Sequence, residues 1–378
     1  MSLKICVVSR SWLSHERSGV TNAVAQHVNV LIQAGHKISI IGSNQSVLHE
    51  KLLVDKSFCV RSLGSGALYS PARVDRLSLV RALKDSQADL VIIEGWQTAL
   101  TTSSIEEAYQ LKIPILMISH GSSVTPFSDK FIELFRALGW KYYKNFVLPR
   151  LISKIHALTT LDLTASSTRF YDRDLAIRLG KPVQLLVNCP ANMNSLYVER
   201  LYRKPQILVI GYYSRIKNQL DAVDLAATIP QGFNFKFVGP KHGSYYKKCV
   251  HRVATLGIKE KVFFLDDSEC NLAEEISNSL LVLSTSITEA LPITLIESMA
   301  AGTPFVATDV GAVSSLKGGL IAYGILDMRK HLLRLLIDHE IWNKLSLQGR
   351  EKYYESYTES IVGDQLFKAI DLCINKNN

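Results

Sequence analysis

Short apolar runs alternate with segments of helical periodicity along this chain, and no other feature constrains the fold as much. In the first half, strands and helices are expected in the order Leu3–Ser9, Val20–Ala34, Lys37–Ile41, Leu90–Ile93, Gln97–Gln110 and Ile115–Ile118. The same alternation restarts at Ile207–Ile210 and continues to Pro304–Ala307. Because strand–helix–strand units build parallel sheets, the sequence predicts two successive α/β sheets.

The interruption between the two patterns predicts a domain boundary. Prolines and polar residues fill Cys189–Gln206 and break the periodicity. We expect four parts: an N-terminal Rossmann-like domain (1–190), a linker (191–206), a second Rossmann-like domain (207–355) and a C-terminal helix (356–378) that packs back on the first domain. Ligands of open parallel sheets bind beyond the carboxyl ends of the strands, so a central cleft between the two domains is the expected site.

The composition is typical of a soluble globular protein, with 47% hydrophobic and 20% charged residues. No apolar run approaches the ~18 residues of a spanning helix, and the apolar start Met1–Trp12 is too short for a signal peptide. Six scattered cysteines without a C-x-x-C pair predict reduced thiols, a cytoplasmic protein and neither a disulfide framework nor a zinc site. The net charge of +9 favours anionic partners, but no nucleic-acid-binding motif accompanies it.

The segment Ser284–Thr303, STSITEALPITLIESMAAGT, follows an expected buried strand and begins a helix. Glu289 stands just before this helix and Glu297 eight residues later, within it. The backbone N–H groups at the start of the helix can hold a diphosphate, and the residues that would supply or shape this site are Leu291, Pro292, Ile293 and Thr294. The alternative is that Glu289 only caps the helix and Glu297 is a solvated helix residue.

This segment resembles the E-x7-E motif of retaining GT-B glycosyltransferases, specifically glycosyltransferase family 4 (glycosyl transferases group 1). The family pattern is roughly E-G-F-P-x-x-x-x-E-A-M-A-x-G-x-P-V-V-A, and this chain has EALPITLIESMAAGTPFVA from Glu289 to Ala307. The resemblance implies that Glu289 contacts the hydroxyls of the donor sugar and that Glu297 contacts the nucleotide ribose. Ala290 and Leu291 replace a glycine and an aromatic residue, which puts the sugar preference in doubt.

Ile210–Leu220, IGYYSRIKNQL, resembles the family's G-R-L-x-x-x-K-G, in which the two cations grip the donor diphosphate. Arg215 and Lys217 would have this role here, by lowering the cost of negative charge on the departing nucleoside diphosphate. Their spacing of two is shorter than the family's five. A shortened loop, with Arg215-Ile216 matching Arg-Leu, is the favoured interpretation. Tyr212 at the arginine position is the alternative, and two solvated loop cations are a third.

His120 follows the expected strand Ile115–Ile118, where related glycosyltransferases carry a His-Gly or His-Asp pair. The resemblance implies that it faces the donor sugar, and an imidazole there can position a hydroxyl or exchange a proton near neutral pH. A structural histidine is the alternative. Gly19 resembles the family's glycine-rich turn after the first strand, although an ordinary helix start explains it nearly as well. Gly239 resembles the strand-end glycine near the nucleotide.

Two charged segments have other interpretations. Asp172-Arg173-Asp174 is a D-x-D string, which holds a metal in another glycosyltransferase fold, but its charged context predicts a solvated helix face. The segment 131–154 mixes aromatic residues with five cations and one acid. It is expected either to lie on an anionic membrane or to pack as helices with a solvated basic face.

The resemblance implies a metal-independent, retaining hexosyltransferase that needs no cofactor. It would move a sugar from a nucleotide sugar, UDP being favoured over GDP, to a hydroxyl of a glycan or lipid-linked glycan in the assembly of surface polysaccharide or glycolipid. The expected location is the cytoplasm, at the inner face of the membrane if segment 131–154 binds lipid. The alternatives are another GT-B enzyme, such as a nucleotide-sugar epimerase or a phosphorylase, and a non-catalytic glycan- or membrane-binding module.

Overall fold

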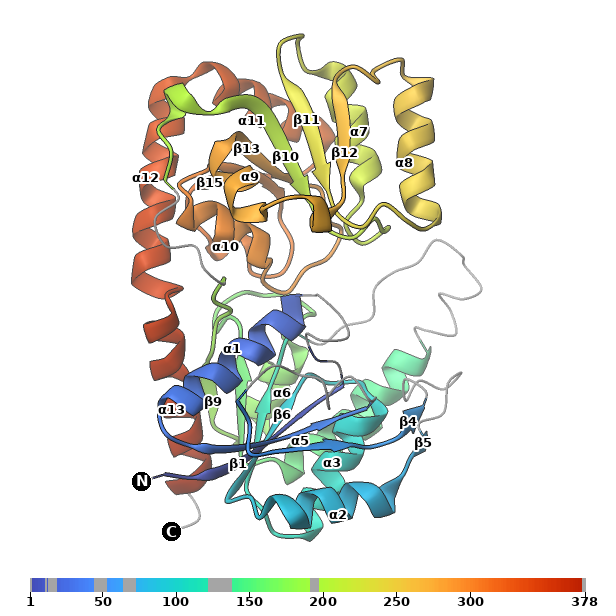
Figure 1. The fold of residues 1–378 in the computed structure, drawn as a ribbon, viewed down its shortest axis with the longest axis vertical. Helices are drawn as coiled ribbons and strands as arrows, with labels where there is room; N and C mark the ends of the chain where they lie inside the picture. Colours follow the sequence, from blue (N-terminus) through green and yellow to red (C-terminus); the bar gives the residue numbers. More distant parts are fainter. Residues whose placement is uncertain are drawn as a thin grey trace. The chain divides into compact units, whose positions relative to one another are not determined.

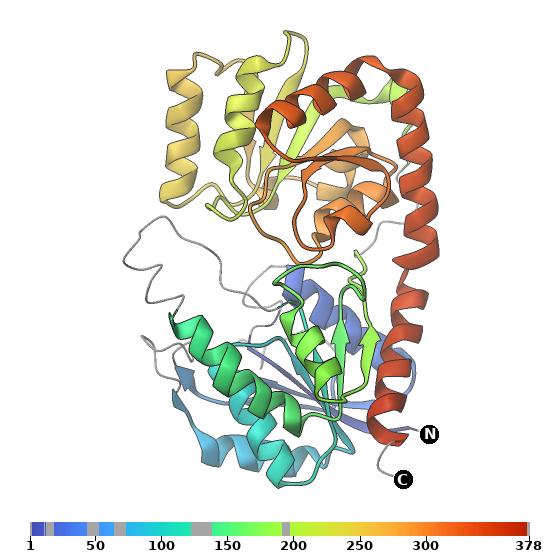
Figure 2. The same cartoon turned by 180° about the vertical axis from the view of Figure 1, so that it is seen from behind.

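The computed structural model of the chain describes residues 2–10, 12, 19–43, 53–63, 73–121, 138–190 and 197–375. The chain divides into two compact units. The N-terminal unit comprises Met1–Ala191 and Glu359–Asn378, and the C-terminal unit comprises Asn192–Thr358. Each unit contains one large parallel β-sheet with helices on both faces (Figures 1 and 2).

The sheet of the N-terminal unit has seven parallel strands in the order β3-β2-β1-β6-β7-β8-β9. Their bounds are β1 Lys4–Ser9, β2 Lys37–Gly42, β3 Lys56–Cys59, β6 Leu90–Glu94, β7 Ile115–Ile118, β8 Ala157–Thr160 and β9 Val183–Leu185. The short strands β4 (Ser62–Leu63) and β5 (Arg73–Val74) pair antiparallel outside this sheet. The chain moves outward from β1 to β3 and returns to pair β6 with β1, so the strand order reverses between β1 and β6.

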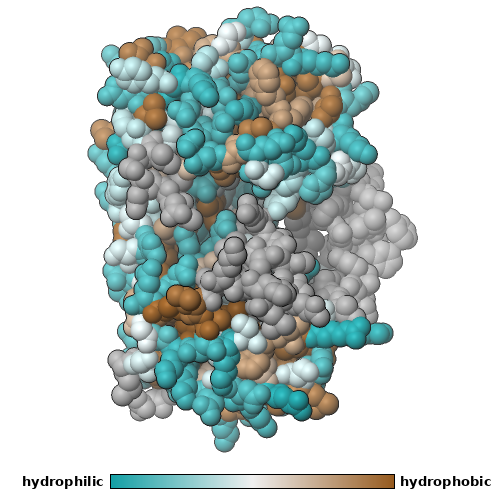
Figure 3. All heavy atoms as spheres, viewed as in Figure 1, coloured by the Kyte–Doolittle hydropathy of each residue, from teal (hydrophilic) through white to brown (hydrophobic). Residues whose placement is uncertain are grey.

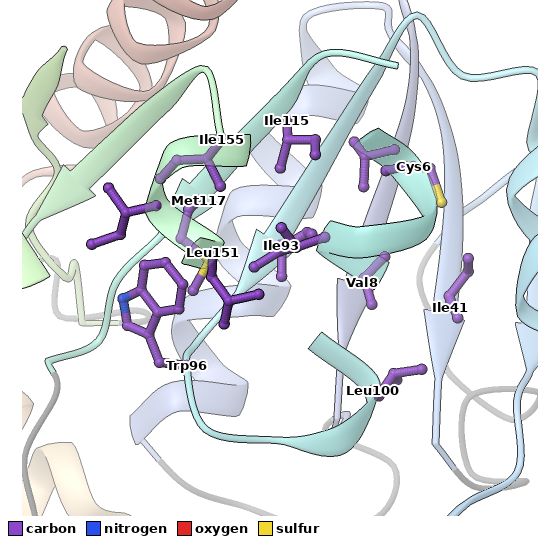
Figure 4. Packing of buried hydrophobic residues seen from close by; sticks show 14 of the residues in the cluster. Cys6, Val8, Ile41, Ile93, Trp96, Leu100, Ile115, Met117, Leu151 and Ile155 are labelled. Atoms are coloured by element: carbon purple, nitrogen blue, oxygen red, sulfur yellow. The ribbon is translucent and has the colours of Figure 1, made fainter. Parts of the chain in front are cut away.

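Helices cover both faces of this sheet. On one face α1 (Gly19–Gln33) contacts α13 (Glu359–Ile374), which also packs on β7, β8 and β9. The other face carries α2 (Arg76–Ser86), α3 (Ala99–Gln110), η2 (Tyr143–Val147), α5 (Leu148–Lys154) and α6 (Tyr171–Arg178). Alternate residues of the strands pack with these helices into one core, in which Trp96 lies beside Met117 and Leu151 (Figure 4).

The sheet of the C-terminal unit has six parallel strands in the order β12-β11-β10-β13-β14-β15. Their bounds are β10 Lys204–Ile210, β11 Asn234–Val238, β12 Val262–Leu265, β13 Ser279–Ser284, β14 Phe305–Thr308 and β15 Gly319–Ala322. Here the order reverses between β10 and β13, which pair directly. The first strand begins three residues earlier than expected, because Lys204 already pairs with Ser279 of β13.

Its helices also form two layers. The helices α7 (Gln219–Thr228), α8 (Ser244–Thr255) and α11 (Ile325–Ile337) pack with the sheet into a core that includes Trp342 of α12 (His339–Ser356). The helices α9 (Leu272–Asn278) and α10 (Ile293–Ala300) contact each other, and α10 also contacts α12. The remaining helical turns are η3 (Arg200–Tyr202), η4 (Asp267–Glu269) and η5 (Val313–Ser315).

Several elements were not expected from the sequence. Strands β3, β8, β9 and β15 are short, and β3 and β9 lie at the edges of their sheet, where only partial burial gives a weak apolar signal. All six cysteines are free thiols. Within the described ranges, no helix combines the length and the apolar character that crossing a membrane requires. Hydrophilic side chains cover much of the surface seen in Figure 3, with hydrophobic ones scattered between them.

Candidate functional site

The predicted site residues gather where the strand order of each sheet reverses. In the C-terminal unit, Lys217 follows β10 and Glu289 follows β13, the two strands that pair at the reversal. In the N-terminal unit, the predicted His120 follows β7, and Glu94, which was not predicted, ends β6 beside Ser9 of β1. Loops at such reversals diverge and leave room for a ligand, so both places fit the rule for ligand sites in open α/β sheets.

Lys217 and Glu289 form an ion pair, with Lys217 Nζ 2.6 Å from Glu289 Oε1. Their side chains are 27% and 15% exposed, so the pair is sheltered yet open to a ligand. Thr285 Oγ1 lies within hydrogen-bonding distance of the carbonyl oxygens of Lys217 (3.0 Å) and Asn218 (2.9 Å). The Ile287 amide donates to the carbonyl of the residue before Lys217 at 2.7 Å. The two loops are therefore joined through their backbones, which fixes the distance between cation and carboxylate.

Three glycines permit this close approach of loops. A Cβ on Gly239, after β11, would lie 2.4 Å from the carbonyl oxygen of Gly211, after β10. A Cβ on Gly311 would lie 2.2 Å and 2.4 Å from the carbonyl oxygens of Glu289 and Ala290. Gly311 has φ +60°, a left-handed conformation that also favours glycine. Gly239 therefore has a packing role beside the donor-binding role predicted for it.

Substitution Gly311→Ala will lower the free energy of unfolding by about 2 kcal/mol or more, because backbone oxygens cannot withdraw as a flexible side chain can. Thermal denaturation measures the loss. Gly324→Ala is the matched control, since nothing lies within 4 Å of the Cβ it would add. Equal stability of the two variants would contradict this role for Gly311.

The N-terminus of α10 lies beside Glu289. Pro292 is the N-cap residue, and Ile293 begins the helix. The side chain of Pro292 makes no hydrogen bond that would cap this end. The amides of Ile293 and Thr294 lie in the first turn, where a helix offers no backbone acceptor, while Leu291 is buried at 5% exposure. The helix therefore presents donors for an anion one turn from the carboxylate.

Glu297 lies in the middle of α10 and is only partly exposed. Burial raises the pKa of its carboxyl from 4.5 to about 7, and the described part of the chain gives it no ion-pair partner. It is therefore not the solvated helix residue of the alternative interpretation. Such a carboxyl needs hydroxyl or amide donors, which a ligand rich in hydroxyls supplies.

Glu297→Gln will make the protein more stable at pH 8 and will flatten the stability profile between pH 5 and 8. The native pKa of about 7 lies above the ordinary 4.5, so the wild-type protein binds more protons than its unfolded chain in this window. Its stability therefore falls as pH rises through 7, by about 2 kcal/mol after allowance for partial exposure. Urea denaturation at pH 5, 6, 7 and 8 measures the difference, and parallel profiles of the two proteins would contradict it.

Arg215 does not join the ion pair. Its side chain is exposed, and its charge acts on Tyr245 of α8. Gly211 and Lys217 are six residues apart, as are the glycine and lysine of the family pattern, and Asn218 has φ +51° where that pattern has its second glycine. This geometry favours the alternative to a shortened loop: Tyr212, which follows Gly211 directly, occupies the arginine position.

In the N-terminal unit two histidines share one buried carboxylate. His27 Nδ1 of α1 lies 2.9 Å from Glu94 Oε1, and His120 Nε2 lies 2.8 Å from Glu94 Oε2. Burial alone would raise the pKa of Glu94, but the charge and hydrogen bonds of the two imidazoles outweigh it and hold that pKa well below its usual range. Gly19 is the first residue of α1, the helix that carries His27.

The D-x-D string is not a solvated helix face, contrary to the prediction. Asp172 is 1% exposed, and its Oδ2 accepts from Trp96 Nε1 at 2.6 Å and from Ser119 Oγ at 2.5 Å. Arg173 is 6% exposed and donates to the carbonyl of Asp162 at 3.0 Å. Only Asp174 is exposed, and it pairs with Arg173. Hydrophobic packing of α6 against the sheet buries these groups together with their partners.

Sequence reasoning missed Glu94, His27 and Asp172. A signal for Glu94 exists, because a lone carboxylate ends the apolar strand β6 at the point where a ligand site is expected. His27 and Asp172 gave no such signal, because each lies within a helix and its partner is distant in the sequence. Glu94 is 67 residues from His27, and Ser119 is 53 residues from Asp172.

The basic segment 131–154 is described from residue 138 onward. Two of its cations are paired internally, since Arg150 and Lys154 lie 3.3 Å and 3.6 Å from Glu106 of α3. Lys144 lies over the ring of Tyr171. The exposed residues of this segment include Leu138, Tyr142 and Phe146, whose side chains are hydrophobic or aromatic. A membrane contact here would therefore depend more on these side chains than on charge.

The family model of glycosyl transferases group 1 matches residues 199–317, which contain both loops of the Lys217–Glu289 pair. N-acetyl-alpha-D-glucosaminyl L-malate synthase of Bacillus anthracis is 28% identical over 166 residues, which are 41% of this chain and 42% of that protein. The chain thus spans less than half the length of that relative.

Solved structures match over nearly the whole chain. Sucrose-phosphate synthase of Thermosynechococcus elongatus has a TM-score of 0.74 and 16% identity, covering 98% of this chain and 99% of that one. HepE of Anabaena, solved with UDP and glucose, has a TM-score of 0.69 and 14% identity with the same coverage. Two parallel α/β sheets, as in these proteins, are the GT-B fold. Residues 199–317 are thus similar to glycosyl transferases group 1, and the two sheets have the GT-B fold.

Proposed function

We propose that this protein is a retaining, metal-independent glycosyltransferase that moves a hexose from a UDP-sugar to a hydroxyl of a glycan or lipid-linked glycan. The observation that carries the proposal is the Lys217–Glu289 ion pair beside the free N-terminus of α10. A cation and the amides at a helix N-terminus suit a departing diphosphate, and a fixed carboxylate suits sugar hydroxyls.

The roles of the residues follow from the chemistry of the leaving group. Lys217 and the amides of Ile293 and Thr294 neutralise the charge that develops on the diphosphate as the glycosidic bond breaks. Glu289 orients the sugar through its hydroxyls, and Glu297 accepts hydrogen bonds from the ribose. A phosphate oxygen of the donor takes the proton of the incoming hydroxyl, so no protein base and no metal is required. The exposed Arg215 contributes less than Lys217.

UDP is the proposed nucleotide because the HepE complex holds UDP and glucose in a chain of the same fold. An acceptor in surface polysaccharide or glycolipid assembly agrees with the net charge of +9, since such acceptors are often phosphorylated. Contact with the membrane surface, at its cytoplasmic face, would use Leu138, Tyr142 and Phe146.

A panel of UDP- and GDP-sugars, each tested for binding by calorimetry and for slow hydrolysis, tests the proposal. One or more UDP-sugars should bind and be hydrolysed in the presence of EDTA. Conversion of the sugar to its epimer without an acceptor would instead indicate an epimerase. No affinity for any nucleotide sugar would overturn the proposal and favour a non-catalytic binding module.

A further inference from the structure

The cluster of His27, Glu94 and His120 lies beside the reversal of strand order in the N-terminal sheet. The Glu94 side chain is fully buried, and each of its oxygens faces one imidazole nitrogen. The two rings are nearly parallel, with an interplanar angle of 14° and centroids 6.4 Å apart. A Cβ on Gly95 would lie 3.8 Å from His120 Cδ2, so the backbone of Gly95 also confines the ring.

The carboxylate determines where the ring protons are. An ionised carboxylate only accepts hydrogen bonds, so both nitrogens that face Glu94 must carry protons. In the neutral ring of His120 the proton is then on Nε2, and Nδ1 has a free lone pair. This Nδ1 atom is buried and has no hydrogen-bond partner within the described ranges. A buried acceptor without a partner is costly, and an O–H group is its natural complement.

A second buried carboxylate holds the turn that carries His120. Ser119 Oγ donates to Asp172 and accepts from the amide of Gly121 at 3.1 Å. Gly121 has φ +91°, which fixes the direction of the chain after His120. The imidazole is thus restrained both at its Nε2 atom and at its backbone.

We propose that Glu94 and His27 are positioning residues that hold His120 in its Nε2–H tautomer, so that His120 Nδ1 accepts a hydrogen bond from a sugar hydroxyl of the substrate. The inference rests on the proposed sugar transfer. Of these three residues, His120 alone touches the substrate. Glu94 acts by fixing the proton of His120, and His27 acts by occupying the other oxygen of Glu94 and orienting the carboxylate.

Nitrogen-15 NMR of the full chain with labelled histidine tests the inference without any need for activity. The His120 signals, assigned by their loss in His120→Gln, should show a protonated Nε2 and an unprotonated Nδ1 at pH 8. A protonated Nδ1 beside an unprotonated Nε2 would overturn the proposal. If no nucleotide sugar supports transfer, the proposed function fails, but this measurement still decides whether Glu94 fixes the tautomer.

Glu94→Gln makes the test sharper. The amide keeps the shape of the carboxylate, but its NH2 group must donate to one of the two rings, so His27 or His120 has to change tautomer. If His120 changes, kcat should fall about 10²-fold or more with KM much less affected, as expected when an imidazole has the wrong tautomer. If His27 changes, kcat should stay within about tenfold of wild type.

Asp172→Asn is the control, because Asp172 accepts hydrogen bonds from Trp96 Nε1 and Ser119 Oγ and supports the turn after β7. The tautomer of His120 should be unchanged in this variant. A 10²-fold loss of kcat in Glu94→Gln with His120 still in the Nε2–H form would show a merely structural role for Glu94 and contradict the inference.

Discussion

Lys217→Ala will lower kcat for sugar transfer by about 10²-fold or more, the usual loss when one group that stabilises developing charge is removed. Its Nζ lies 2.6 Å from Glu289, at the carboxyl ends of the strands β10 and β13 and beside the free N-terminus of α10. The effect should appear mainly in kcat, since the diphosphate gains charge only as its bond to the sugar breaks. Steady-state kinetics with saturating donor measure it.

Two further variants separate charge from other effects. Lys217→Gln keeps a hydrogen-bond donor without the charge and should lose activity to a similar extent. Lys236→Ala is the matched control, because Lys236 forms a comparable ion pair with Glu275, at 2.9 Å and 19% exposure. It should keep the wild-type kcat. If Lys217→Ala transfers sugar at near the wild-type rate with saturating donor, the role assigned to Lys217 is wrong.

Arg203→Ala will destabilise the C-terminal unit by about 3–5 kcal/mol, the cost of removing one partner from a buried, charged hydrogen-bond network. Arg203 is 6% exposed. It donates to Thr303 Oγ1 at 2.5 Å and to the carbonyl oxygens of Val198, Ser279, Ala301 and Gly302 at 2.7–3.3 Å. Burial lowers its pKa to about 10, so it stays charged at neutral pH.

The network explains why the loss is large. Arg203 joins the backbone before β10 to the start of β13 and to the turn after α10, and its guanidinium lies 5.0 Å from the ring of Trp342. Alanine would leave these acceptors without their donor and would open a cavity beside Trp342. Urea denaturation measures the change, and hydrogen exchange of β10 and β13 assigns it to this unit.

Arg252→Ala supplies the comparison for Arg203. Arg252 pairs with Asp224 at 2.6 Å, but both side chains are well exposed. Water screens an exposed pair, so this variant should be nearly as stable as wild type. Similar losses in Arg203→Ala and Arg252→Ala would contradict the burial argument.

The sequence predicted the two sheets because their central strands are mostly apolar. Leu90–Glu94 and Ser279–Ser284 are buried along almost their whole length, and such runs are recognisable without a structure. It also predicted the segment Glu289–Glu297, since helix start, carboxylates and proline lie within nine consecutive residues. Edge strands such as β9 escaped prediction because partial burial leaves a mixed composition.

The sequence could not align the loop after β10, because two cations at unusual spacing allow more than one interpretation. The backbone geometry favours one of them: Asn218 has a positive φ, and Lys217 lies 2.6 Å from Glu289. The D-x-D string was likewise misjudged, because burial of Asp172 depends on Trp96 and Ser119, which come from other strand ends.

By itself, then, the sequence determined the strand–helix alternation and the local chemistry of the helix that carries Glu297. Both features depend on residues that lie close together in the chain, so their spacing can be read from the sequence. Only the tertiary structure decided that Glu94 joins His27 to His120 and that Arg203 links β10 to β13. Such groups meet because parallel strands bring distant loops to one edge of a sheet. Once the groups are buried, each polar group needs the other as its hydrogen-bond partner, because an unpaired buried group is costly.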